Sequence, residues 1–151
     1  MRKVRDMYFV DREKIEEILV YLEKQLSLLG KHTALHSDIE KLALERLSHM
    51  VIEAVLDVGN AMIDGFIMRD PGSYEDIIDI LEDEKVIDHE MAISYKKVIA
   101  YRKPLVQSYT GIQHDELNKS FQLELAQLKK FPTAVRDYLM KELGPVSAFR
   151  N

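Results

Sequence analysis

Apolar side chains recur every three or four residues along most of the chain, which is the spacing of one face of an α-helix. The first predicted helix spans about residues 11–29, and its apolar positions are Ile15, Ile18, Leu19, Leu22, Leu26 and Leu29. Asp11 is suited to cap the start of this helix, and Gly30 is suited to the position just beyond its end.

The second predicted helix begins at Ser37, where Ser37-Asp38-Ile39-Glu40 reads as a capping box, and continues to about Met68. Its second half is apolar on most sides, so it must be covered from several directions. We expect one layer of neighbours from the same chain to be insufficient, which favours a dimer. Gly59 and Gly65 lie inside this helix, where each costs about 1 kcal/mol relative to Ala. Close approach of another helix is the expected compensation.

The rest of the chain predicts shorter helices. A turn at residues 70–72 precedes a helix that Ser73 caps, and a further helix runs from about Asp88 to Tyr109, with a kink or break just before Pro104. Gly111 marks another break, and two more helices follow over residues 115–130 and 132–143. We therefore predict an all-α antiparallel bundle of five to six helices. Residues 1–145 are expected to form one domain, and residues 146–151 a loose tail.

Composition supports a helical protein and excludes several kinds of chemistry. Only six glycines and four prolines occur among 151 residues, which argues against a many-stranded β fold. The absence of cysteine excludes disulfides, Cys-ligated zinc, iron–sulfur clusters and thiol catalysis. The net charge of −5 removes an overall electrostatic attraction for nucleic acid but does not exclude a local basic patch. No segment reads as a signal peptide or membrane span, so we expect a cytoplasmic protein.

The segment over residues 100–109 carries the candidate chemistry. Arg102 is the next position on a helical stripe formed by Met91, Tyr95 and Val98, so its guanidinium points at apolar neighbours and needs an anionic partner or several acceptors. Positive charge is concentrated nearby, at Lys96, Lys97 and Lys103. One interpretation is a phosphate site at a helix kink. The other is an arginine paired with a core carboxylate, with the lysines solvated.

A stripe of polar residues follows the second predicted helix at spacings of four, four, three and four: His49, Glu53, Asp57, Asn60 and Asp64. On a functional interpretation, Asp57 or Asp64 pairs with Arg102 and His49 lies near the site. On a structural interpretation, the stripe is the solvated face of an amphipathic helix.

Three segments in this order resemble the HepT-like branch of the HEPN superfamily and its YutE-like proteins: Val58-Gly59-Asn60, Pro71-Gly72-Ser73-Tyr74 and Arg102 to Tyr109. The resemblance covers about residues 8–140. It implies a helical bundle that forms homodimers. Active members are metal-independent RNA endonucleases, toxins paired with a neighbouring nucleotidyltransferase antitoxin. Their motif is an Arg, four to six residues, a His, and commonly one further residue and a Tyr, which the antitoxin can nucleotidylate. Two copies of the motif face each other across the dimer interface.

Carried onto this chain, the resemblance assigns the motif arginine to Arg102 and the tyrosine to Tyr109, while Gln107 occupies the histidine position. Lys103 stands where relatives usually have asparagine, and Pro104 follows it. A positioned acid or base contributes about 10²–10⁴-fold to such a reaction, and imidazole suits the task, whereas an amide cannot exchange protons at neutral pH. The resemblance therefore implies a toxin-family ribonuclease that is weak or inactive. The alternative is a catalytically dead binding module for a nucleotidyltransferase or RNA.

No cofactor or metal is expected. A di-metal bundle site requires Glu-x-x-His pairs, and the chain has none. Four further histidines lie near predicted loops or helix starts and are expected to be solvated: His32, His36, His89 and His114. We expect dimerisation through the second and fourth predicted helices, with Asp57, Asn60, Asp64 and Lys103 supporting the site. Tyr109 should be open to solvent if a partner modifies it.

Overall fold

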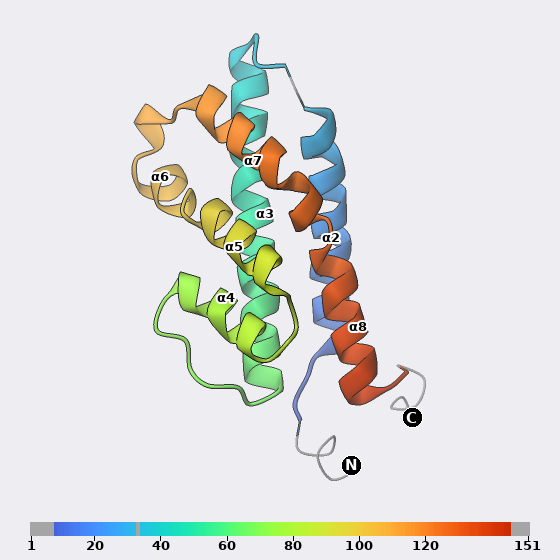
Figure 1. Cartoon of the computed structure of the whole chain (residues 1–151). Helices are drawn as coiled ribbons and strands as arrows, with labels where there is room; N and C mark the ends of the chain where they lie inside the picture. Colours follow the sequence, from blue (N-terminus) through green and yellow to red (C-terminus); the bar gives the residue numbers. More distant parts are fainter. Residues whose placement is uncertain (1–7, 33, 146–151) are drawn as a thin grey trace.

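The computed structural model describes residues 8–32 and 34–145, and all regular structure in those ranges is helical (Figure 1). The all-α prediction is thereby confirmed, whereas the expected tail at residues 146–151 lies outside the described residues. The elements in chain order are α2 (Arg12–Lys31), α3 (Asp38–Gly65), α4 (Tyr74–Asp83), α5 (His89–Ile99), α6 (Arg102–Gln107), the 3₁₀ turn η1 (Tyr109–Gly111), α7 (His114–Leu128) and α8 (Phe131–Leu143).

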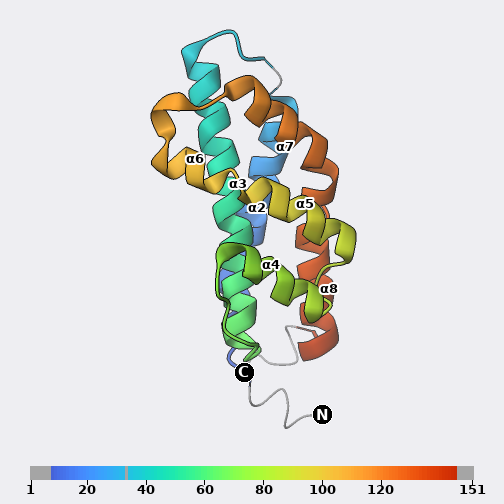
Figure 2. The same ribbon diagram turned by 60° about the vertical axis from the view of Figure 1, so that its left-hand side comes forward.

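Helices α2 and α3 form a long antiparallel pair that runs the length of the molecule (Figures 1 and 2). The predicted capping box starts α3: Ser37 Oγ accepts a bond from the Glu40 N–H at 3.1 Å, and Glu40 Oε1 accepts one from the Ser37 N–H at 2.9 Å. Helix α2 continues past the predicted end, so Gly30 lies in its last turn. A Cβ at Gly30 would be 3.2 Å from Leu125 Cδ2 of α7, so this glycine lets α7 lie close to α2.

The apolar second half of α3 is covered by helices of the same chain, which corrects the expectation that its own neighbours would be insufficient. Helices α2, α4, α6 and α7 all contact α3. Its large apolar side chains from the middle onward are almost fully buried, including Val51, Ile52, Val55, Val58 and Met62. The apolarity of α3 therefore gives no evidence for a dimer.

The two glycines of α3 allow close packing of different neighbours. A Cβ at Gly59 would be 2.6 Å from Ile77 Cγ2 of α4, so the predicted close helix approach is confirmed there. At Gly65 the neighbour is the extended segment before α2 and not a helix, because a Cβ would be 2.9 Å from Val10 Cγ2. The N–H of Phe9 in that segment donates to the Gly65 carbonyl at 3.0 Å.

The predicted break before Pro104 is also confirmed. Helix α5 ends at Ile99 and α6 begins at Arg102, which places Pro104 in the first turn of α6, where its missing N–H costs no helical hydrogen bond. Helix α6 contacts α3, and α7 then crosses both α2 and α3 (Figure 1). None of the helices in the described ranges combines the length and apolarity that a bilayer crossing requires.

Candidate functional site

Arg102, the first residue of α6, lies between an acid and an aromatic ring. Its Nε donates to Glu53 Oε1 of α3 at 2.6 Å, and its guanidinium carbon is 4.3 Å from the ring centre of Tyr74 on α4. The carboxylate partner that the sequence required is therefore present, but it is Glu53 and neither Asp57 nor Asp64. About a quarter of each side chain of the Arg102–Glu53 pair is exposed, so the pair borders solvent.

The guanidinium of Arg102 keeps unused donor capacity. Within the described residues, its hydrogen bonding is confined to Nε, and Nη1 and Nη2 have no acceptor. These two nitrogens form the planar fork that matches two oxygens of a phosphate or carboxylate. Glu53 and the Tyr74 ring together fix the plane of the fork, so a bound anion would not have to order it.

The segment around Pro71-Gly72-Ser73-Tyr74 places Tyr74 at the site. Ser73 Oγ accepts a bond from the Asp76 N–H at 3.0 Å and thereby caps α4, of which Tyr74 is the first residue. The close approach at Gly59 brings α4 against α3, on which Glu53 lies. Of the three segments that carry the family resemblance, the second thus supplies Tyr74 to the Arg102 guanidinium, and the first supplies Gly59, which lets α4 lie close to α3.

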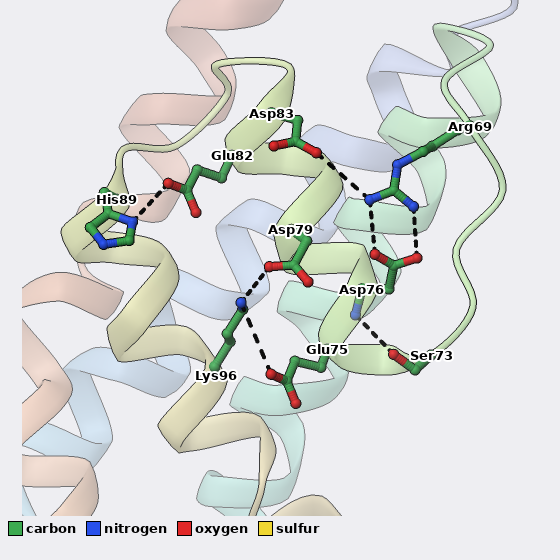
Figure 3. A network of polar contacts seen from close by, with 9 residues as sticks. All are labelled: Arg69, Ser73, Glu75, Asp76, Asp79, Glu82, Asp83, His89 and Lys96. Atoms are coloured by element: carbon green, nitrogen blue, oxygen red, sulfur yellow. Dashed lines mark hydrogen bonds and ion pairs between the residues drawn. The ribbon is translucent and has the colours of Figure 1, made fainter.

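A polar network holds α4 in place (Figure 3). Arg69 donates from both terminal nitrogens to Asp76 at 2.8 and 2.9 Å, and the Gly72 N–H donates to the same carboxylate at 2.9 Å. The Arg69 guanidinium lowers the pKa of Asp76 to about 2. On the side toward α5, Lys96 pairs with Asp79. Lys96 is therefore paired with an acid of α4 and does not contribute to a phosphate site.

The polar stripe on α3 divides into two parts. The expected position of His49 near Arg102 is confirmed, the expected pairing of Asp57 or Asp64 with Arg102 is wrong, and the second part of the stripe faces solvent. His49 and Glu53 are half-buried, and His49 Nε2 lies 3.4 Å from Glu53 Oε1. The remaining three residues, Asp57, Asn60 and Asp64, are exposed. Neighbouring residues still exclude part of the water around the Asp57 carboxylate, which raises its pKa; the charge on Glu53 raises this pKa further, whereas Lys14 and Arg102 act in the opposite direction. His49 is accordingly part of the Arg102 cluster.

A pocket of about 220 Å³ opens beside this cluster, lined by Leu42, Glu45, Arg46, His49 and Leu105. Arg46 has no ion-pair partner within the described ranges and is exposed, so it adds an available cation. Sequence reasoning missed Arg46, although it lies three residues before His49 and hence on the same helix face.

The expectation that His114 is solvated is wrong, because His114 Nε2 lies 2.7 Å from Glu45 Oε2 and both side chains are about a quarter exposed or less.

The other motif positions lie on the surface. Lys103, Gln107 and Tyr109 are all exposed, and Tyr109 is 65% exposed, which confirms the expected solvent access. Helix α6 ends at Gln107, and Tyr109 lies in η1. The helix that begins at Arg102 therefore ends before Tyr109, so the two residues do not lie on one face of a continuous helix.

A larger pocket, of about 690 Å³, lies between the α4–α5 connection and α8. Its charged lining is mostly acidic, with Glu82, Glu84, Asp88, Asp137 and Glu142 against Lys85, Lys141 and His89. Such a lining repels phosphate, so the Arg102 cluster is the better candidate. The described part of the chain contains no group of three or more His, Asp or Glu side chains arranged to hold a metal ion.

Comparison with known proteins agrees with the resemblance seen in the sequence. Residues 12–135 match the HepT-like family, described as "Ribonuclease HepT-like". The chain is 54% identical over 144 residues to "Putative RNase YutE" of Bacillus subtilis (strain 168), covering 95% of this chain and 100% of that protein. It is also similar, with a TM-score of 0.91 and 54% identity over 95% of this chain and 100% of the other, to the solved structure of YutE from Bacillus subtilis, described as a cytosolic protein of unknown function. The chain therefore belongs to the HepT-like ribonuclease family.

Proposed function

We propose that the protein binds RNA at Arg102 and cleaves it slowly, as a metal-independent endonuclease whose site is shared by two copies of the chain. The observation that carries this proposal is the half-buried guanidinium whose two terminal nitrogens have no acceptor among the described residues. Membership of a ribonuclease family makes an RNA phosphodiester the expected ligand.

Arg102 has two roles in this proposal. Its fork binds the nonbridging oxygens of one phosphodiester, and the same positive charge stabilises the extra negative charge that these oxygens acquire during cleavage. Exposed Lys103, the next residue, adds positive charge for the neighbouring backbone. The acids of the cluster limit affinity, so the site suits a single phosphate contact more than an extended basic groove.

Gln107 sets the expected rate. Its amide can donate a hydrogen bond to a phosphate oxygen, but it cannot take the proton of a 2′-hydroxyl. We therefore propose cleavage slower by about 10²–10⁴-fold than that of a relative with histidine at this position, unless another group transfers the proton.

A second copy of the chain would complete the site. Exposed apolar side chains lie on the elements around Arg102: Tyr21 on α2, Leu42 on α3, Val106 on α6 and Tyr109 on η1. Burying them against another copy would remove apolar surface from water and bring two Arg102 side chains toward one RNA backbone. Tyr109 remains the residue that a nucleotidyltransferase antitoxin would modify, since its hydroxyl-bearing ring is open to solvent.

The catalytically dead binding module is the second candidate function, and the amide at Gln107 is the observation that favours it. The two are separated by incubating the purified protein with RNA in EDTA. Cleavage by the native chain that is lost in Arg102→Ala supports the ribonuclease. Binding without cleavage, together with cleavage gained in Gln107→His, supports the binding module. RNA affinity that is unchanged in Arg102→Ala contradicts the ribonuclease and an RNA-binding module at Arg102, and leaves only a module that binds a nucleotidyltransferase.

A further inference from the structure

We infer that His49 of α3 performs the proton transfer that Gln107 cannot perform. This inference rests on the proposed function, since it concerns the reaction at the Arg102 phosphate site. It places the reacting phosphodiester over the first half of α3 and not over the end of α6.

One carboxylate oxygen, Glu53 Oε1, lies next to both the Arg102 guanidinium and the His49 imidazole. Glu53 Oε1 accepts the bond from Arg102 Nε at 2.6 Å and lies 3.4 Å from His49 Nε2. Because both distances end on the same oxygen atom, Arg102 Nε and His49 Nε2 are at most 6.0 Å apart. A phosphate held by the guanidinium and the ribose hydroxyl attached to it can bridge such a separation.

The pocket provides the space for this arrangement. His49 lines it together with Arg46 and with Leu105, which lies three residues after Arg102. The His49 side chain is 31% exposed, so it is accessible to a substrate yet held by its neighbours. Neither Arg102 nor Gln107 lines this pocket, so a phosphate on the Arg102 guanidinium would enter it from beside Leu105. Among the polar lining residues, Arg46 cannot accept a proton and Glu45 is paired with His114, which leaves the His49 imidazole as the group that can take a proton there.

The charged and titratable groups around His49 come from three helices. Arg46 and the two acids Glu45 and Glu53 lie on α3, Arg102 on α6, and His114 on α7. Both acids are already engaged, Glu45 with His114 and Glu53 with Arg102. Arg46 has no such partner in the described ranges and is free to hold a second phosphate oxygen or the next phosphate along the chain.

The reaction then balances without a metal or a redox partner. The neutral imidazole of His49 takes the proton of the 2′-hydroxyl, and the electron pair left on the 2′-oxygen forms a bond to phosphorus. The bond between phosphorus and the 5′-oxygen breaks, and its electron pair stays on that oxygen. Water protonates the departing oxygen, and the imidazolium returns its proton to the hydroxide that remains. The products are a 2′,3′-cyclic phosphate and a 5′-hydroxyl end.

The test compares the native chain with His49→Ala, His49→Gln and Arg102→Ala, and uses His36→Ala as the matched control. His36 is exposed in the connection before α3, and its backbone N–H, not its side chain, donates a hydrogen bond to Glu40. Two quantities are measured in EDTA: the rate at which an RNA oligonucleotide yields cyclic phosphate, and the affinity for the same sequence as uncleavable 2′-O-methyl RNA. Circular dichroism verifies folding, and His49→Gln retains a polar side chain beside Glu53 if the alanine variant does not fold.

We expect both His49 variants to cleave at least about 10²-fold more slowly than the native chain, with affinity for 2′-O-methyl RNA unchanged within about twofold. Added imidazole should restore cleavage by His49→Ala, a rescue that a merely structural role would not produce. His36→Ala should behave as the native chain.

Three results would overturn the inference, and each leaves a different conclusion for the proposed function. If His49→Ala cleaves at the native rate and Arg102→Ala does not cleave, the ribonuclease stands and His49 has no part in it. If the native chain binds RNA through Arg102 but yields no cyclic phosphate, His49 transfers no proton and the binding module stands. If Arg102→Ala binds and cleaves as the native chain does, the proposed function fails together with the inference.

Discussion

Gly59→Ala tests how the site is held together, because two effects on this substitution oppose each other. Alanine is favoured over glycine inside a helix by about 1 kcal/mol, so helix propensity alone predicts a more stable protein. The new Cβ, however, would lie 2.6 Å from Ile77 Cγ2 and 3.5 Å from Leu81 Cδ1. A contact of 2.6 Å forces α4 to move, and overpacking of this kind costs about 1–3 kcal/mol.

We therefore expect Gly59→Ala to lower the free energy of unfolding by about 1 kcal/mol and the melting temperature by about 2–4 °C. Urea denaturation and calorimetry measure both quantities. Gly111→Ala is the matched control, because a Cβ at Gly111 would meet nothing within 4 Å, and its effect should stay within about 0.5 kcal/mol.

A double-mutant cycle identifies the cause. Ile77→Ala removes the methyl group that collides with the new Cβ, so Gly59→Ala should cost less in that background than in the native chain. A Gly59→Ala protein as stable as the native chain or more so would refute the close approach of α4 to α3, and with it the explanation of how Tyr74 reaches Arg102.

Three further predictions concern the aromatic contact, acid stability and assembly. Tyr74→Ala should weaken RNA binding by about two- to fivefold, whereas Tyr74→Phe should not, since an exposed cation–π contact is worth about 0.5–1 kcal/mol; equal affinities measured by fluorescence anisotropy would exclude a role for the ring. Arg69 lowers the pKa of Asp76 from 3.8 to about 2 in the folded protein, so its stabilisation is fully present above pH 3.8 and is lost as the pH falls through about 2. Asp76→Asn should therefore lower the melting temperature more at pH 6 than at pH 2, and an equal loss at both values would contradict this origin. Light scattering at micromolar concentration should give twice the chain mass of 17.6 kDa, and a monomer would remove the shared site.

The parts of the fold that depend only on residues adjacent in the sequence could be predicted. The serine caps of α3 and α4 and the break before Pro104 each follow from a few adjacent residues, and the structure contains all of them. The requirement that Arg102 have an anionic partner was also correct, because burying a guanidinium without an acceptor is costly.

The identity of that partner could not be predicted. Glu53, Asp57 and Asp64 occupy one stripe of α3, and only the way in which α6 packs against α3 selects Glu53. Tyr74 lies 28 positions before Arg102, and its contact depends on the position of α4, which no local pattern specifies. The argument for a dimer from the apolarity of α3 failed for a related reason. Hydropathy shows how many sides of a helix must be buried, but not which chain buries them.

The salt dependence of RNA binding tests most directly whether the Arg102 guanidinium holds a phosphate. Affinity for single-stranded 2′-O-methyl RNA is measured across a series of salt concentrations for the native chain and for Arg102→Ala, with Lys119→Ala of α7 as the control. We predict that Arg102→Ala binds about 10–100-fold more weakly and that the slope of log affinity against log salt falls by about 0.7, the value of one phosphate contact. Native affinity and an unchanged slope in Arg102→Ala, or the same change in Lys119→Ala, would contradict the assignment.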